Sequence, residues 1–143
     1  MIGEVCFQVD TVKSDSEQRS VILVIEDVEE TRDGIEQLLT TSGHRVRTAR
    51  NEDEAVGETR LHRPDLILIS LGLNVLEVLS IVARIREHAG IGEDIPFVIF
   101  CSPDLDEGAE LTAGHNVYLT RPDNFDQLRA FLSRLLPKKA RPC

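Results

Sequence analysis

The stretch Asp65-Leu66-Ile67-Leu68-Ile69-Ser70 decides the fold. Its unbroken apolar run predicts a strand buried on both faces, as in a parallel sheet. Similar runs cover residues 21–25, 95–100 and 117–120, and each is followed by polar residues: Glu26-Asp27, Cys101-Ser102 and Arg121-Pro122. Because parallel strands bring their carboxyl ends to one edge of a sheet, we expect a site at that edge.

Helical patterns separate these strands. We predict helices over about 29–42, 51–62, 75–88, 103–113 and 124–136, and a short edge strand over 44–49. Strands that alternate with helices indicate a parallel sheet with helices on both faces. We therefore predict a single flavodoxin-like, doubly wound α/β domain with a five-stranded parallel sheet in the order 2-1-3-4-5. Asp27 is also placed to cap the first helix.

The chain of 143 residues divides into one domain and two flanking segments. We expect the domain over 21–136, an N-terminal arm or linker over 1–20, and a basic tail over 137–143. In the arm, Val5, Phe7 and Val9 alternate with polar residues. The arm is either an unstructured linker, an extra edge strand or a dimer contact.

Composition excludes several classes of function. A net charge of −9 argues against a nucleic-acid binder, which needs a basic face. No apolar run reaches the roughly 18 residues that span a membrane. The three cysteines form no C-x-x-C pair and show no zinc-ligand spacing. A reduced, cytoplasmic setting fits these features.

At its strand ends the chain resembles the response-regulator receiver domain of bacterial two-component signalling. The resemblance covers about residues 20–136 and rests on four segments in order: V-I-L-V-I-E-D, R-P-D-L-I-L-I-S, I-P-F-V-I-F-C-S and V-Y-L-T-R-P-D. In that family an acid pair holds a magnesium ion, and an aspartate after the third strand accepts a phosphoryl group from a histidine kinase. A threonine or serine and a lysine contact that phosphoryl group.

The resemblance implies an acidic pocket that has lost its nucleophile. Glu26 and Asp27 match the metal-binding pair, while Ser70 stands at the phosphoacceptor position. A serine hydroxyl is neutral and is a weak nucleophile without a general base. The resemblance therefore implies a degenerate pseudo-receiver that requires no cofactor and keeps at most weak or vestigial magnesium binding.

The switch-equivalent positions have also changed. Cys101 stands at the hydroxyl position with Ser102 one place along, and Arg121 replaces the lysine before Pro122. Either the Arg121 guanidinium pairs with a pocket carboxylate in place of the metal, or it points into solvent. Tyr118, at the family's aromatic switch position, is either a partner-contact anchor or a half-buried strand residue.

We expect a stand-alone, atypical receiver that is not an enzyme and acts by protein–protein interaction in phosphorelay signal transduction, since only residues 137–143 follow the last helix. The resemblance implies that a histidine kinase or output protein docks on about 103–136; a homodimer is also open. The alternatives are an unrecognised phosphoacceptor, a switch phosphorylated on Ser70, and a small enzyme or ligand binder. No glycine-rich phosphate loop or Cys–His pair supports the last.

Overall fold

The computed structural model describes residues 19–100 and 105–136. Predictions for the N-terminal arm, for Cys101 and Ser102, and for the basic tail lie outside the described residues. No helix in the described ranges combines the length and the apolar character needed to cross a bilayer.

Three largely buried strands form the centre of the sheet. They are β1 (Val21–Ile25), β3 (Leu66–Ile69) and β4 (Phe97–Phe100), and they are buried because they are apolar on both faces. β2 (Arg45–Ala49) flanks β1, β6 (Val117–Arg121) flanks β4, and every contact among these strands is parallel. The parallel arrangement and the order predicted for the five strands are confirmed.

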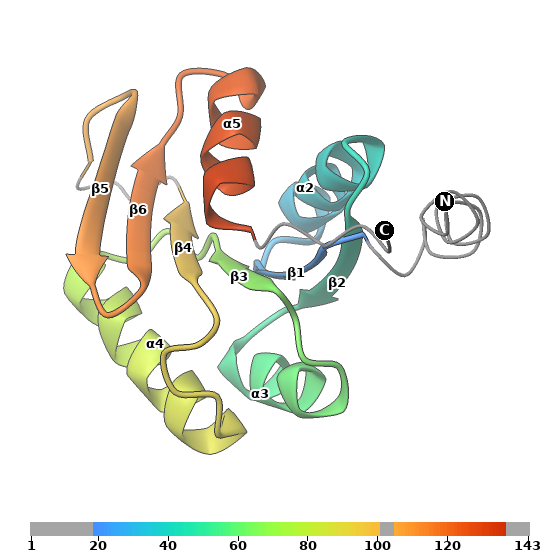
Figure 1. The fold of residues 1–143 in the computed structure, drawn as a ribbon, viewed down its shortest axis with the longest axis vertical. Coiled ribbons are helices and arrows are strands. Elements are labelled where there is room, and N and C mark those ends of the chain that lie inside the picture. Colours follow the sequence, from blue (N-terminus) through green and yellow to red (C-terminus); the bar gives the residue numbers. More distant parts are fainter. Residues whose placement is uncertain (1–18, 101–104, 137–143) are drawn as a thin grey trace, which may run out of the picture.

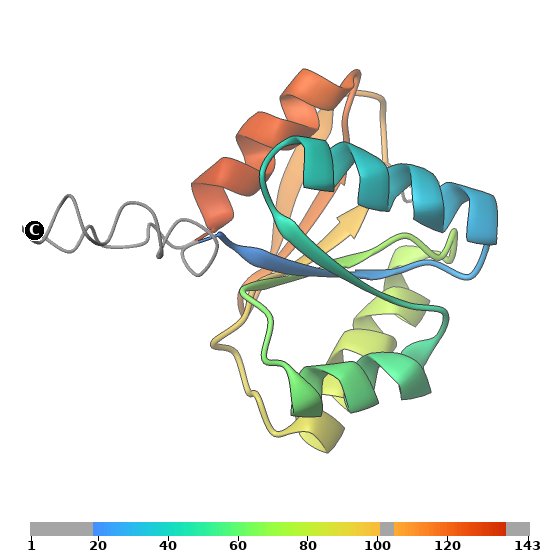
Figure 2. The same cartoon turned by 90° about the vertical axis from the view of Figure 1, so that its right-hand side faces the viewer.

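Two helices cover each face of this sheet. α2 (Glu29–Thr41) and α5 (Phe125–Leu135) pack on one face, and α3 (Glu52–Leu61) and α4 (Val75–Ala89) pack on the other. Figure 2 shows the sheet nearly edge-on between the two pairs. Successive strand residues point to opposite faces, so each central strand contributes to two separate hydrophobic cores.

Asparagine side chains begin three of the helices. Asn51, Asn74 and Asn124 each accept a hydrogen bond from the backbone N–H three residues later, which satisfies a donor that has no partner within the helix. The helix α2 differs, because its N-cap residue is Val28 and no side chain caps it. The prediction that Asp27 caps this helix is wrong, since Asp27 lies one residue before the cap position.

The helix predicted over 103–113 is wrong in the part that the structure describes. Ala109–Gly114 forms a sixth strand, β5, which pairs antiparallel with β6. His115 and Asn116 join the two strands, and their φ angles of 55° and 63° are those of a tight two-residue hairpin turn. Over residues 19–100 and 105–136 the sheet therefore has six strands, not five, in the order β2-β1-β3-β4-β6-β5, with β5 outermost (Figure 1).

Candidate functional site

The ends of β1 and β3 bring Glu26 and Ser70 together. Ile25 and Ile69 are partners in the parallel register, and the Ser70 N–H donates to the Ile25 carbonyl oxygen over 2.8 Å. The side chains of the residues that follow the two strands are therefore adjacent, and the Ser70 hydroxyl donates to Glu26 Oε1 over 2.8 Å. The sequence predicted this contact, because neighbouring parallel strands end at the same edge of the sheet.

Glu26 is a buried carboxylate with internal hydrogen-bond donors. Its residue is only 4% exposed, so an unpaired charge there would be costly. Ser70 satisfies Oε1, and the Val28 N–H donates to Oε2 over 3.1 Å. Two neutral donors therefore hold this carboxylate in place, which makes the Ser70 hydroxyl part of the local structure.

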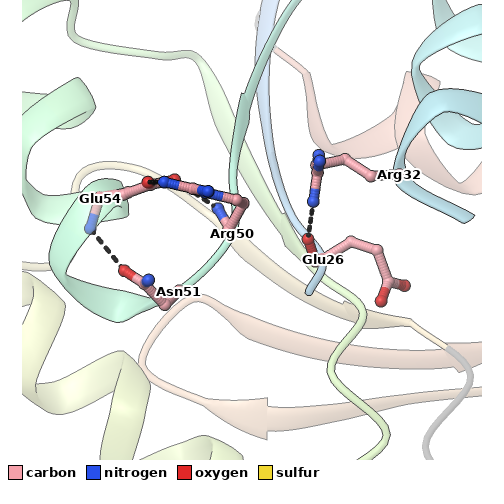
Figure 3. A network of polar contacts seen from close by, with 5 residues as sticks. All are labelled: Glu26, Arg32, Arg50, Asn51 and Glu54. Atoms are coloured by element: carbon pink, nitrogen blue, oxygen red, sulfur yellow. Dashed lines mark hydrogen bonds and ion pairs between the residues drawn. The ribbon is translucent and has the colours of Figure 1, made fainter. Parts of the chain in front are cut away.

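Arg32 lies beside the pocket and contacts Glu26 through its backbone. Arg32 Nη1 donates to the Glu26 carbonyl oxygen over 3.0 Å. In Figure 3 the Glu26 carboxylate points away from this guanidinium. Sequence reasoning missed Arg32, although its place in the first turns of α2, just after the acid pair, was a signal that it would lie close to the pocket.

A second polar group neighbours the pocket at the start of α3 (Figure 3). The Glu26 N–H donates to the Ala49 carbonyl oxygen, which brings Arg50 close to the end of β1. Arg50 forms an ion pair with Glu54, and its hydrogen bonds lower the pKa of the Glu54 carboxyl below the usual value; the more distant charge of Arg32 acts in the same direction. The Glu54 carboxylate therefore binds Arg50.

Asp27 is the exposed member of the acid pair. With Glu26 it offers two carboxylates to a cation. Within residues 19–100 and 105–136, no group of three or more His, Cys, Asp or Glu side chains is arranged to hold a metal ion. Magnesium is held in many proteins by one or two carboxylates together with water, so Glu26 and Asp27 fit a sparse, water-rich magnesium site.

Arg121 binds a backbone carbonyl oxygen and not the acid pair. Its residue is exposed, and Nη1 donates to the Leu105 carbonyl oxygen over 2.8 Å. The structure therefore does not bring Arg121 onto a pocket carboxylate, and the solvent-facing alternative describes its position better. Pro122, the next residue, is half-buried.

Tyr118 is packed between β6 and α5. It is half-buried, its ring meets Phe131 edge-on with ring centroids 6.4 Å apart, and its hydroxyl donates to Asn116 Oδ1 over 3.0 Å. Both ends of the side chain are thereby held within the domain. The geometry agrees with the half-buried alternative for Tyr118.

Comparison of the sequence with known proteins identifies the family of this chain. The family model for the response regulator receiver domain matches residues 22–133. The chain is 33% identical over 114 residues to the transcriptional regulatory protein KdpE of Staphylococcus aureus, covering 78% of this chain and 48% of KdpE. It is 29% identical over 125 residues to the response regulator MprA of Mycobacterium tuberculosis, covering 83% of this chain and 53% of MprA. The chain thus spans about half the length of these relatives.

Solved structures agree on the fold. The receiver domain of the sensor histidine kinase PA1611 from Pseudomonas aeruginosa, solved with a magnesium ion in its active site cleft, is 27% identical. Its TM-score is 0.61, and the match covers 82% of this chain and 97% of that one. The chemotaxis protein CheY4 of Vibrio cholerae is 19% identical with a TM-score of 0.60, covering 82% and 99%. This chain therefore belongs to the response regulator receiver domain family.

Proposed function

We propose that this receiver signals through protein contacts and does not accept a phosphoryl group. The hydrogen bond of 2.8 Å from the Ser70 hydroxyl to Glu26 carries the proposal. The acceptor step of a receiver requires an ionised carboxylate that attacks phosphorus. Here the residue after β3 is a neutral hydroxyl, and its proton is committed to satisfying a buried carboxylate. Ser70 thus acts as a structural partner of Glu26, and the domain is a pseudo-receiver.

Two further contacts support the proposal. The guanidinium of Arg121, at the position where the family has a lysine, donates through Nη1 to the Leu105 carbonyl oxygen, and no hydrogen bond joins it to Glu26, Asp27 or Ser70 among the described residues. Oε2 of Glu26 already accepts from the Val28 N–H. The pocket is therefore internally satisfied without a phosphoryl group, as expected of a domain that holds one shape.

Weak magnesium binding by Glu26 and Asp27 is part of the proposal. The two carboxylates supply fewer oxygens than the roughly six that the ion prefers, so water would complete the shell. When bound, the ion would neutralise the acidic edge. Titration by calorimetry should give an affinity in the millimolar range for the wild type. The Ser70→Asp variant, which adds a third carboxylate, should bind magnesium more tightly; equal affinities would contradict the assignment of the site.

A second candidate function rests on the same hydrogen bond. Glu26 lies within proton-transfer reach of the Ser70 hydroxyl, which is the geometry of a general base beside a nucleophile. Ser70 is then a non-standard phosphoacceptor, modified either by phosphoryl transfer or by a serine kinase. This candidate predicts a phosphoserine, which is chemically stable, in place of the labile acyl phosphate of an ordinary receiver.

Intact-mass analysis after incubation with acetyl phosphate and magnesium separates the candidates. We expect no mass increase for the wild type. An increase of about 80 Da that hydroxylamine removes would reveal an unrecognised carboxylate acceptor and refute the proposal. An increase of the same size that resists hydroxylamine and is absent from Ser70→Ala would establish the second candidate.

The proposed partner is a histidine kinase or an output protein that reads the shape of the domain. Its contact surface is β5, β6 and α5, the described part of the predicted surface 103–136. We propose a cytoplasmic setting and a role without enzymatic activity. The stand-alone role stays a prediction: an immunoblot of the source cells that detects the receiver only within a larger polypeptide would contradict it.

A further inference from the structure

The outer edge of β5 is an open strand edge in the part of the chain that the structure describes. β5 pairs with β6 on one side, and no other strand of the described residues pairs with its second side. An edge strand presents backbone N–H and C=O groups that another strand can bind, and proteins often block such edges with lysine or proline. β5 contains neither residue, and its one charged side chain, Glu110, is tied to Arg134 and Gln127. A register shift after Thr112 limits the regular edge to residues 109–112.

One face of this edge offers apolar surface. Leu111 is 54% exposed although it pairs in register with Leu119, which is only 4% exposed. Cross-strand partners share a face, so Leu111 lies on the side of the sheet that α4 covers. A hollow of about 620 Å³ opens there between α4 and the hairpin, lined by Leu79, Val82 and Val117 among others. An added strand would cover Leu111 and turn side chains toward this hollow.

The surroundings of β5 are acidic. Carboxylates gather at both ends of the strand: Asp106, Glu107, Glu110 and Asp123 near its start, and Glu87 and Glu93 near the hairpin turn. The nearby guanidinium groups are fewer, and they donate to groups of the domain itself: Arg121 to a backbone carbonyl, Arg134 to Glu110, and Arg86 to two carbonyls. The edge therefore attracts a basic segment and repels an acidic one.

The negative charge around β5 determines which kind of segment can bind at its outer edge. A second copy would bring its own Glu110 and neighbouring carboxylates against the same groups. The alternating stretch 5–9 of the N-terminal arm is flanked by Glu4 and Asp10, so it too carries like charge. The basic tail 137–143 has the opposite charge, but Pro137 and Pro142 interrupt it and lack the backbone N–H that an added strand donates. We propose that the outer edge of β5 receives an extended, lysine- or arginine-rich segment of a partner protein as an added strand. The inference rests on the proposed contact signalling and names the class of partner.

The test uses the full chain labelled with ¹⁵N and a pair of synthetic peptides of matched length. The basic probe is acetyl-KVTVKVR-amide and the acidic one is acetyl-EVTVEVE-amide. We expect the basic peptide alone to shift the amide resonances of residues 109–112. Raising the salt from about 0.05 to about 0.5 M should weaken its binding several-fold. Leu111→Lys should weaken it at least about tenfold, because it adds like charge at the edge.

Leu76→Lys is the matched control, since Leu76 is a leucine on α4 that is 78% exposed. It should leave peptide binding unchanged. The proposal is overturned by no shift with the basic peptide, by equal shifts with both peptides, or by equal losses in the two lysine variants. It is also overturned if the β5 amides that point away from β6 are already protected from exchange in the free chain, by the arm or by a second copy. The acetyl phosphate experiment detects phosphorylation and does not depend on peptide binding, so either result can fail without the other.

Discussion

Replacing Ser70 by alanine tests the hydroxyl–carboxylate contact energetically. The variant removes one of the two donors that hold the Glu26 carboxylate, which is only 4% exposed. Hydrogen bonds to charged groups contribute about 1.5–3 kcal/mol, and an unsatisfied buried acceptor costs a similar amount. Ser70 is itself half-buried, so water can partly replace the hydroxyl, and we expect the lower half of that range.

Urea denaturation monitored by circular dichroism measures this loss. We expect Ser70→Ala to lower the free energy of unfolding by about 1.5–2 kcal/mol, and the melting temperature by roughly 3–8 °C for a domain of this size. Ser80→Ala is the matched control: its hydroxyl donates to the Leu76 carbonyl oxygen on the exposed side of α4, and its loss should change stability by less than about 0.5 kcal/mol.

A double-mutant cycle with Glu26→Gln isolates the charge in this contact. Beside a neutral amide, loss of the Ser70 hydroxyl should cost only about 0.5–1.5 kcal/mol, so the two substitutions should not be additive. Equal stability changes for Ser70→Ala and Ser80→Ala, or strict additivity in the cycle, would refute the claim that Ser70 stabilises the buried carboxylate.

Three other substitutions test the surrounding structure. Gly108→Ala should destabilise by about 1–2 kcal/mol in urea, because φ is +84° and the added Cβ would meet Asp123 Oδ2 at 3.0 Å; wild-type stability would contradict the turn geometry. Tyr118→Phe should lower the free energy of unfolding by about 0.5–1.5 kcal/mol through loss of its hydroxyl bond, and no change in the melting temperature would place the hydroxyl in water. The pKa of Glu54 is lowered by Arg50, so its contribution to stability is present above its usual pKa of 4.5 and is lost as the pH falls through the lowered value. Urea midpoints of Glu54→Gln should therefore fall less than those of the wild type on acidification, and parallel pH profiles would count against the ion pair.

The parallel sheet could be predicted because its strands are apolar without interruption. The segments 21–25 and 66–69 are too short for buried helices, and the patterns between them repeat at helical spacing. The meeting of Glu26 with Ser70 followed from the same reasoning, since adjacent parallel strands end at the same level. These predictions depend only on chain periodicity and sheet geometry.

The sixth strand could not be predicted in the same way. Ser102-Pro103 is a strong helix-start signal, and it outweighed the alternation of Ala109, Leu111 and Ala113 with polar residues. The hairpin turn uses His115-Asn116 in place of the glycine-containing pairs that usually announce such turns. The alternating segment becomes a strand because β6 offers it a partner, and that partner is a tertiary contact.

Long side chains at the site were equally hard to place. Arg121 directly follows a buried stretch of β6, and the sequence allowed it to reach either a carboxylate or solvent. Its choice depends on the Leu105 carbonyl oxygen, which the preceding loop brings to it. Arg32 reaches the Glu26 carbonyl oxygen because α2 packs over the end of β1. Sequence spacing placed Arg32 near the end of β1, but it did not specify the carbonyl oxygen that either arginine binds.

A crystal structure of the wild type grown with magnesium and soaked in acetyl phosphate tests the central claim most directly. The account predicts that the Ser70 hydroxyl stays within hydrogen-bond distance of Glu26 Oε1, near the 2.8 Å described above, and that no phosphorus is bonded to Ser70, Glu26 or Asp27. Phosphorus bonded to any of these side chains, or a Ser70 hydroxyl turned away from Glu26, would contradict it.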